Sequence, residues 1–556
     1  MTNQQQNETV SNANQSEIDM LARQSEHSES IQAQGFQDSP TPTSNLHKKK
    51  VRVQVSAGNS NQQFKLVEKV LSKNGFYYSS ADELITIGSD KKISISNSIA
   101  LQVNDLSRLI EFVQVVPDKK GGFEDKIINP PRLIADALVG LNDRSSSPIP
   151  RINAVVDHHL FDVNGNLLKS GYNKDSGIYV SSDHTPVIPN KPTKDDAIKA
   201  LEKIKKIIRT IYFDVPEDHA AGLCAILTAS IRPVLETAPL IVISSPSKGA
   251  SKGLFGKISS RFAENKPQKV AILAGNEDEI QKDLVSRLRK VEPVMFYDEV
   301  TNKEIDSPAL RSLATSPEMS CRMLGSNTLV ELSTRTYVVI LGIGVSVKAD
   351  MTRRVLAIHM DPHCEFPEAK HFDYEPLKDV EKNRDELIDA VLTIQRAYLQ
   401  SGDHDNFKGT LPAIGSFEDW NKMCRLPIAW LTGIDPATRM LDNLKDDPER
   451  NTCDRIFKMW SAAFGDKQTT TKQVIEKANK DPDGDFFDFL KPVATNFKSG
   501  KLDTTVFGKW LGRFNGKRVN GLILTKGSKI HGDRTWRVIP IADNETLPPP
   551  ETEEAE

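Results

Sequence analysis

The sequence has little of what marks secreted, zinc-binding or membrane proteins. Its 556 residues include only five cysteines and no C-x-x-C pair: Cys224, Cys321, Cys364, Cys424 and Cys453. This spacing fits neither a zinc site nor a disulfide framework, so we expect buried, reduced thiols. The first thirty residues lack an apolar signal segment, and no run of 18 apolar residues occurs. These absences predict a cytoplasmic protein with no membrane partner.

An excess of charge of one sign is also absent. Lysine and arginine number 72 and aspartate and glutamate 75, which gives a formal net charge of -3. A near-neutral total says little about partners, because it can conceal a local basic surface. The composition, 38% hydrophobic and 26% charged, is that of an ordinary globular protein. The chain is too long for a single hydrophobic core, so several domains are expected.

Shifts in composition divide the chain into five segments. Polar residues fill 1–49, which ends in three lysines, and acidic residues fill 542–556, so both tails are expected to be disordered. The lysine run fits either a nucleic-acid contact or a solvated flank. Between the tails we expect an N-terminal α/β and hairpin region at 50–190, an α/β core with a helical extension at 191–440, and a further domain at 441–541.

Hydrophobic periodicity predicts the elements that precede the core. Helical spacing occurs at 64–71 and at 106–112, and a strand pattern occurs at 83–87. Turn residues within 149–192 indicate hairpins. Thr193 is a suitable N-cap for the helix that follows, because two aspartates occupy its first turn.

A loop suited to phosphate follows the apolar run 239–243. It consists mainly of small and basic residues: Lys248, Gly249, Ala250, Ser251, Lys252, Gly253 and Leu254. In a P-loop, backbone N–H groups wrap phosphate, a lysine reaches the β- and γ-phosphates, and a helix N-terminus stands behind them. The pattern G-x-x-x-x-G-K-[ST] is broken here at Pro246, Ser251 and Gly253. Taken alone, the segment is equally well explained as a surface loop.

A second apolar strand, 291–299, ends in two adjacent carboxylates, Asp298 and Glu299. In a Walker B strand the first carboxylate holds Mg²⁺ and the second polarises the attacking water. A strand that merely ends in a solvated Asp-Glu pair is the alternative.

A third apolar strand, 337–341, leads to the adjacent arginines Arg353 and Arg354. Paired arginines after a core strand can reach a γ-phosphate in the same or a neighbouring subunit, as an arginine finger does. Three buried strands in series, each followed by such residues, predict a P-loop fold that binds ATP and Mg²⁺.

Further short motifs continue this series in order along the chain. They are Gly171-Tyr172-Asn173, Leu227-Thr228, Arg232, the loop 246–254, 296–299, Gly325-Ser326, 350–354, Asp361-Pro362, Glu365, Pro367, 392–398, 415–420 and 433–436. The series resembles the P-loop replication ATPases of phages, plasmids and other mobile elements, relatives of the superfamily 3 and AAA+ helicases. The resemblance implies an AAA+-like core that works on DNA as a ring, with ATP between subunits.

The chain departs from that family at two positions of the nucleotide site. Ser251 replaces the glycine before Lys252, and its Cβ crowds the loop if the residue has a positive φ. Ile343 stands where the family usually has the sensor 1 asparagine, which positions the attacking water. An isoleucine cannot bond water through its side chain, so ATP binding with slow or absent turnover is the alternative to hydrolysis.

The segment 441–541 carries a second set of signals. Helical periodicity occurs at 453–464, 470–479, 486–497 and 505–514, and strand patterns follow at 522–524 and 536–539. Helices followed by a hairpin indicate a winged-helix-like domain, which places one helix in the DNA major groove. The last helix also resembles a Gly-x-Trp-Leu element of the same family.

Basic residues in this domain form the predicted DNA contacts: Lys509, Arg513, Lys517 and Arg518. Lys509 and Arg513 are four residues apart, so they share one face of their helix. A protein-docking module or a solvated helix face is the alternative.

Two functions therefore stand side by side. One is an ATP-dependent DNA helicase or replication ATPase of a mobile element, acting as a homo-oligomeric ring on DNA and alongside replication proteins. The other is a nucleotide-binding, hydrolysis-deficient scaffold or loader for DNA replication. A primase is disfavoured, because residues 51–190 contain no zinc motif and no metal-carboxylate pattern.

Overall fold

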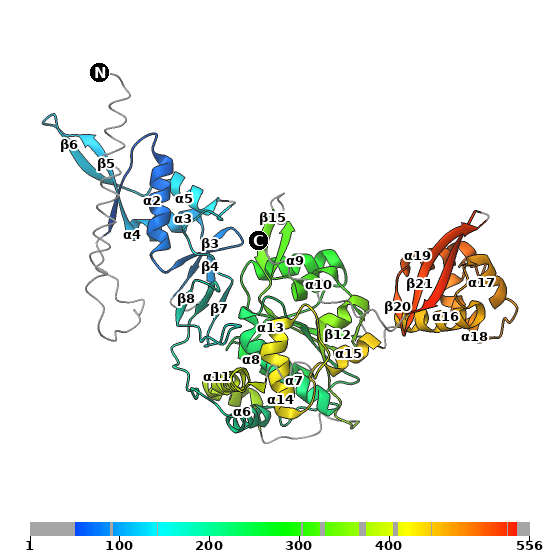
Figure 1. The fold of residues 1–556 in the computed structure, drawn as a ribbon. Coiled ribbons are helices and arrows are strands. Elements are labelled where there is room, and N and C mark those ends of the chain that lie inside the picture. The colour runs from blue at the N-terminus through cyan, green and yellow to red at the C-terminus, as the bar shows by residue number, and fades with distance from the viewer. Residues whose placement is uncertain are drawn as a thin grey trace, which may run out of the picture. The chain divides into compact units, whose positions relative to one another are not determined.

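A computed structural model describes most of the chain (Figure 1): residues 50–88, 93–141, 143–301, 304–322, 329–365, 374–403, 410–445, 448–530 and 532–541. The two predicted tails lie outside these ranges, as do Gly325-Ser326 and Pro367 of the motif series. The described chain is mixed α/β. No helix in those ranges has both the length and the hydrophobicity that a bilayer span requires.

One compact unit comprises the described residues up to Gly58 together with 103–130. Its three-stranded sheet has the order β1-β5-β6, and it contains β1 (Val51–Gln54), α4 (Ser107–Leu109), β5 (Ile110–Pro117) and β6 (Phe123–Ile128). The predicted helix at 106–112 is wrong beyond Leu109. Ile110 and Phe112 are buried on either side of Glu111 and pair with β1, so a period of two prevails there.

The second unit begins with a small layer of helices and an antiparallel sheet. Its elements are α2 (Ser60–Ser72), β2 (Tyr77–Ser80), β3 (Glu83–Ile87), β4 (Ile93–Ile95), α3 (Ser98–Ala100) and α5 (Arg132–Val139). The predicted helix at 64–71 and the predicted strand at 83–87 are confirmed.

A second three-stranded sheet follows, made of β7 (Ala154–Val156), β8 (Gly171–Asn173) and β9 (Ile178–Val180). β8 and β9 are antiparallel, whereas β7 and β9 are parallel. A tight turn precedes β8, where the N–H of Asp162 donates to the carbonyl of Asn166 at 2.8 Å. The predicted hairpins in this region are confirmed for the β8–β9 pair.

The centre of the second unit is a five-stranded sheet in which every strand is parallel to its neighbours. The strands are β10 (Leu240–Ser245), β11 (Val270–Ala271), β12 (Val294–Thr301), β16 (Tyr337–Ile343) and β18 (Val355–His359). Their order in the sheet is β11-β12-β16-β10-β18. All six residues of β10 are buried, as a strand covered on both faces requires.

Helices pack around this sheet (Figure 1): α6 (Lys194–Ile207), α7 (Pro216–Ile231), α8 (Lys252–Ala263), α9 (Glu277–Leu288), α10 (Pro308–Thr315), α11 (Pro376–Gln400), α14 (Leu426–Thr432) and α15 (Thr438–Lys445). Thr193 caps α6 through reciprocal bonds with Asp196, as predicted. α7 ends at Ile231, before a 3-10 turn that contains Pro233. Proline lacks the N–H that would continue the α-helix.

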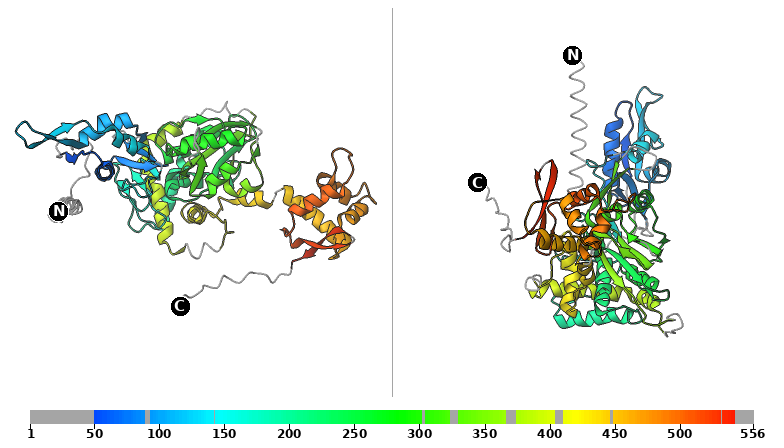
Figure 2. Two further views of the ribbon diagram at one scale, coloured as in Figure 1. Left: turned by 90° about the horizontal axis from the view of Figure 1, so that it is seen from above. Right: turned by 90° about the vertical axis from the view of Figure 1, so that its right-hand side faces the viewer.

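The last described segment has a separate hydrophobic core, distinct from that of the five-stranded sheet. Its elements are α16 (Pro448–Phe464), β19 (Thr469–Thr470), α17 (Thr471–Ala478), α18 (Asp485–Ala494), α19 (Thr504–Arg513), β20 (Arg518–Val519), β21 (Leu522–Ile530) and β22 (Asp533–Pro540). β21 and β22 form a hairpin that extends past the helices (Figure 2). Both strands are longer than predicted, and α18 ends three residues before Phe497.

The cysteines largely behave as expected. Cys224, Cys321, Cys424 and Cys453 are buried and unoxidised. Cys364 is exposed, so the expectation of burial is wrong for this one residue.

Candidate nucleotide site and nucleic-acid surface

The order of the five-stranded sheet marks the position, called the crevice below, at which sheets of this kind bind ligands. From β10 the chain crosses to β11 at the far side, whereas from β16, the neighbour of β10, it crosses in the opposite direction to β18. Adjacent parallel strands whose connections diverge in this way leave an opening at their carboxyl ends, where ligands of such sheets bind. The loop 246–251 follows β10 at this opening, and Gly344 follows β16.

The loop itself has the backbone of an anion cradle. Gly249 and Ser251 both have positive φ, +77° and +61°, and Ser251 immediately precedes α8. The N–H groups of Lys248, Gly249 and Ala250 meet no acceptor within the described part of the chain. Unpaired N–H groups beside a helix N-terminus attract anions. The condition under which Ser251 crowds the loop is therefore met, because a residue with a Cβ is strained at positive φ.

Lys252 is folded back onto its own loop. Its Nζ donates to Ser245 Oγ at 2.5 Å and to the Ser247 carbonyl at 3.0 Å, and Ser245 Oγ donates to that same carbonyl. Burial lowers the pKa of the Lys252 ammonium, and the charge of Asp298 partly offsets this. Motif reasoning identified the lysine but missed Ser245, although its position as the last strand residue before the loop was visible in the sequence.

Asp298 lies beside the first turn of α8. A Cβ built on Gly253 would lie 3.9 Å from Asp298 Oδ2, so the two segments are in contact. Asp298 and Glu299 do not end their strand as predicted. They form a bulge between Tyr297 and Val300, after which β12 pairs with β16 again.

The bulge gives the two carboxylates different settings. Glu299 has a φ of +62° and is exposed, whereas Asp298 is half-buried and accepts the Glu299 N–H at 2.7 Å. β-Bulges re-aim side chains next to functional sites, and strained non-glycine residues concentrate at such sites.

The end of β16 is packed too closely for a larger residue at one position. A Cβ on Gly342 would come within 2.1 Å of the Val300 carbonyl, so only glycine fits. The N–H of Gly344 donates to the Ser245 carbonyl at 3.1 Å and ties this turn to the end of β10. Ile343 is half-buried between them and pairs with Thr301 of β12.

Arg353 and Arg354 lie far from Lys252 in the same chain. They end the 3-10 helix η3 (Ala349–Arg354), and the next residue, Val355, pairs with Leu240 at the start of β10. The loop follows Ser245 at the opposite end of β10, about 17 Å further along the strand. Arg354 is half-buried and donates to the Asp350 carbonyl, while Arg353 is exposed.

Arg439, in α15, was not identified from the sequence. Its guanidinium binds both oxygens of Asp218 at 2.6 and 2.5 Å and Asp214 at 2.8 Å. Asp218 also accepts the N–H of His359, the last residue of β18, at 2.8 Å. This Arg439 clasp ties α15 to the carboxyl end of the strand beside β10. Burial lowers the pKa of His359, the charge of Arg439 lowers it further, and Asp218 and Asp214 partly offset this.

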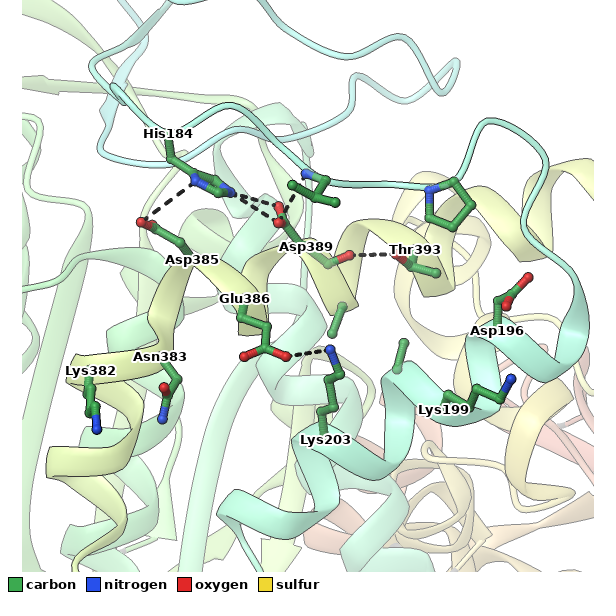
Figure 3. Close-up of a pocket in the computed structure, with 14 residues that line it drawn as sticks. His184, Asp196, Lys199, Lys203, Lys382, Asn383, Asp385, Glu386, Asp389 and Thr393 are labelled. Carbon is green, nitrogen blue, oxygen red and sulfur yellow. Dashed lines mark hydrogen bonds and ion pairs between the residues drawn. The ribbon is translucent and has the colours of Figure 1, made fainter.

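A cavity of about 730 Å³ lies elsewhere, between α6 and α11 (Figure 3). His184 Nε2 contacts Asp389 at 3.0 Å, and Lys203 pairs with Glu386 at 2.5 Å. Four of the polar side chains that line this cavity are thus paired with one another. We therefore place the candidate chemistry at the crevice of the sheet, where backbone strain, a half-buried lysine and a carboxylate coincide.

The predicted DNA contacts belong to the most basic part of the chain. Residues 504–540 contain eight basic residues and a single acidic one, Asp533: Lys509, Arg513, Lys517, Arg518, Lys526, Lys529, Arg534 and Arg537. Residues 448–503 contain ten basic and nine acidic residues, so the excess is local. All the basic residues of 504–540 except the half-buried Lys517 are exposed. A cluster of this sign is the electrostatic footprint of a polyanion-binding surface.

The hairpin of β21 and β22 is fixed near its turn by Gln468. The side-chain carbonyl of Gln468 accepts from Ser528 Oγ at 2.9 Å and from Thr535 Oγ1 at 3.0 Å. A Cβ on Gly527 would collide with these same groups. The four cations added by the hairpin, Lys526, Lys529, Arg534 and Arg537, were not among the predicted contacts.

Comparison with known proteins adds little. No family model matches the sequence, and no curated protein matches it. A solved structure described as the A form apo structure of the NrS-1 C-terminal region, residues 305–718, aligns over 80% of this chain and 100% of its own. The identity is 12% and the TM-score 0.31. A likeness this weak supports no conclusion about fold or function.

Proposed function

We propose that this chain is a P-loop replication ATPase that uses ATP and Mg²⁺ to work on DNA. One observation carries the proposal. The half-buried Lys252 at the start of α8 lies within electrostatic reach of Asp298, in the crevice that the strand order β11-β12-β16-β10-β18 leaves open. A lysine and a carboxylate from adjoining segments at such an opening are what a Mg²⁺-nucleotide needs.

The residues around Lys252 fit a Mg²⁺-nucleotide. The loop offers N–H donors to phosphate, Lys252 supplies the cation for the β- and γ-phosphates, and Asp298 supplies the oxygen ligand that Mg²⁺ prefers. When bound, the metal neutralises charge on the phosphates. Glu299, exposed on the bulge, is the candidate group for orienting the attacking water.

Phosphate binding requires a change in the loop, because Lys252 is already hydrogen-bonded to it. Lys252 now donates to the Ser247 carbonyl, which is an acceptor and repels phosphate. The hydrogen bond from Lys252 Nζ to the Ser247 carbonyl has to break, whereas the one to Ser245 Oγ can remain. Expelling water around a half-buried lysine strengthens its attraction for phosphate.

The position of Arg353 supports action between copies of the chain. An exposed arginine at the opposite end of the strands from Lys252 cannot reach a phosphate held by that lysine. A neighbouring copy that presents its η3 to the crevice would bring Arg353 there, which is the ring arrangement that we propose.

The segment 441–541 is proposed as a winged-helix-like DNA-binding domain. Its helices precede a long basic hairpin, and α19 carries Lys509 and Arg513 on an exposed face. In such domains a helix lies in the major groove, and the cations around it neutralise phosphates.

The test is ATP turnover by the purified chain with and without single-stranded DNA, beside Lys252→Ala as background. We expect DNA-stimulated turnover that is lost in the variant. Turnover equal to that of Lys252→Ala under every DNA condition, with no Lys252-dependent nucleotide binding, would reject the proposal.

The second candidate is a nucleotide-binding scaffold or loader that does not hydrolyse ATP. Two observations favour it: Ile343 ends β16 with an apolar side chain, and Ser251 is strained at a positive φ. On this view Ile343→Asn raises turnover at least tenfold from near background. Equal turnover of wild type and Ile343→Asn, both well above background, would exclude it.

A further inference from the structure

Phe497 is fully exposed, with a relative accessibility of 101%. Every other phenylalanine and tryptophan between 448 and 540 belongs to the hydrophobic core of that segment or packs against it. A large aromatic that contributes nothing to the core leaves its whole apolar surface in water, at a cost that folding does not require. The position therefore needs a reason outside the fold.

The loop that carries Phe497 is well defined by its own hydrogen bonds. The N–H of Asn496 donates to the Lys501 carbonyl at 2.9 Å, and the N–H of Gly500 donates back to the Asn496 carbonyl at 2.8 Å. The side chain of Asn496 accepts the N–H of Lys498 at 3.0 Å. A bridge between Thr495 and Leu502 closes the base of the loop. The ring is thus displayed at the tip of an ordered turn.

The charges around the ring have one sign. Lys498 and Lys501 flank it, both are exposed, and within the described chain neither forms an ion pair. No acidic residue occurs from 489 to 502. The next one, Asp503, is occupied in capping α19, where it accepts the N–H groups of Thr505 and Val506. The partner of this tip must therefore combine a flat apolar face with negative charge.

We propose that Phe497 stacks on a nucleobase of DNA while Lys498 and Lys501 bind the adjoining phosphates. An exposed aromatic between cations is the arrangement by which proteins hold single strands, since every base has a π-face. Phe497 precedes α19, so it accompanies the proposed groove-binding helix and would engage bases that are unpaired at a junction between single and double strand. This inference rests on the proposed DNA binding and specifies the form of DNA that is bound.

The experiment measures the affinity of the full chain for three fluorescent DNAs of one sequence: a single strand, a forked duplex and a blunt duplex. The variants are Phe497→Ala, Phe497→Trp and, as a matched control, Phe123→Ala. Phe123 is also an exposed phenylalanine, 76% accessible, but lies in the first unit. A thermal melt of each variant confirms folding, which a fully exposed side chain does not influence.

We expect Phe497→Ala to weaken binding to the single strand and the fork by about tenfold and binding to the blunt duplex by less than twofold. Phe497→Trp should keep the affinity, and its fluorescence should be quenched by the two DNAs with unpaired bases. Phe123→Ala should leave all three affinities unchanged.

Three results would overturn the inference. An equal loss on the blunt duplex would mean that the ring wedges between base pairs. Unchanged affinities in Phe497→Ala would assign the ring to a protein partner. If the wild-type chain binds none of the three DNAs, the proposed DNA function fails as well, which separates that failure from the loss of stacking alone.

Discussion

The crevice at the end of β10 and the basic stretch 504–540 place their chemistry in opposite ways. In the crevice, a few atoms at defined distances matter: one half-buried lysine, one carboxylate and a backbone held at positive φ. In the stretch, eight cations, seven of them exposed, occur with a single acidic residue among them. The crevice should lose its activity when any one of these groups is removed. The basic stretch should lose DNA affinity step by step as cations are removed, because each cation contributes separately.

The largest effect should come from the crevice. Asp298→Ala removes the carboxylate beside Lys252, and we expect the rate of ATP turnover to fall by at least 100-fold. The matched control is Lys257→Ala, which removes an exposed lysine from the same helix as Lys252. A similar loss in both variants would show that the effect does not depend on the Asp298 carboxylate, and the distinction between the two regions would lose its support.

A mixing experiment tests whether the crevice is completed by a second copy. Lys252→Ala and Arg353→Ala should each be inactive alone, but an equal mixture should regain roughly a quarter of wild-type turnover. Half of the neighbouring pairs contain an intact lysine, and half of these face an intact arginine. No recovery on mixing would place the catalytic arginine elsewhere.

A smaller effect is expected in the basic stretch. Lys509→Ala should weaken duplex DNA binding by about three- to tenfold and lower the salt slope of log Kd by about one. A double variant with Arg534→Ala should add a similar step. Lys472→Ala, an exposed lysine on α17, is the control and should have little effect. If one substitution abolished DNA binding, the basic stretch would depend on a single residue, as the crevice is expected to do.

The smallest expected effect concerns stability. Ser251→Gly removes a Cβ from a residue at φ +61°, so we expect the free energy of unfolding to rise by about 0.5–1 kcal/mol. Ser247→Gly, in the same loop, relieves no positive φ and should give no gain. A chemical denaturation series with both variants measures the difference.

The sequence predicted the parts of the crevice that depend on strand pattern. Apolar runs before Lys252 and Asp298 were sufficient to place Lys252 after one buried strand and Asp298 late in another, and parallel strands bring such segments together. The spacing could not predict the bulge at Asp298 and Glu299. A bulge depends on register with β16, which is a contact between residues distant in sequence.

Other features were invisible for the same reason. Arg439 and Asp218 are 221 residues apart, and only the packing of α15 against β18 unites them. Phe497 continued a helical periodicity, yet α18 ends at Ala494 after Pro492, and the following loop turns the ring outward. Local pattern favoured a helix there, and the proline and the loop hydrogen bonds decided otherwise.

The Arg439 clasp has a mechanical consequence. In sequence, α15 ends at Lys445 and α16 begins at Pro448, so three Cα–Cα steps of at most about 11 Å join them. Arg439 grips two carboxylates, one of which also holds the last residue of β18. The Arg439 clasp therefore holds α15, and the start of α16 to within that distance of it, to the strand beside β10. A displacement of α16 beyond that distance would pull on α15 and β18, and a displacement of β18 would pull on α16 in the same way.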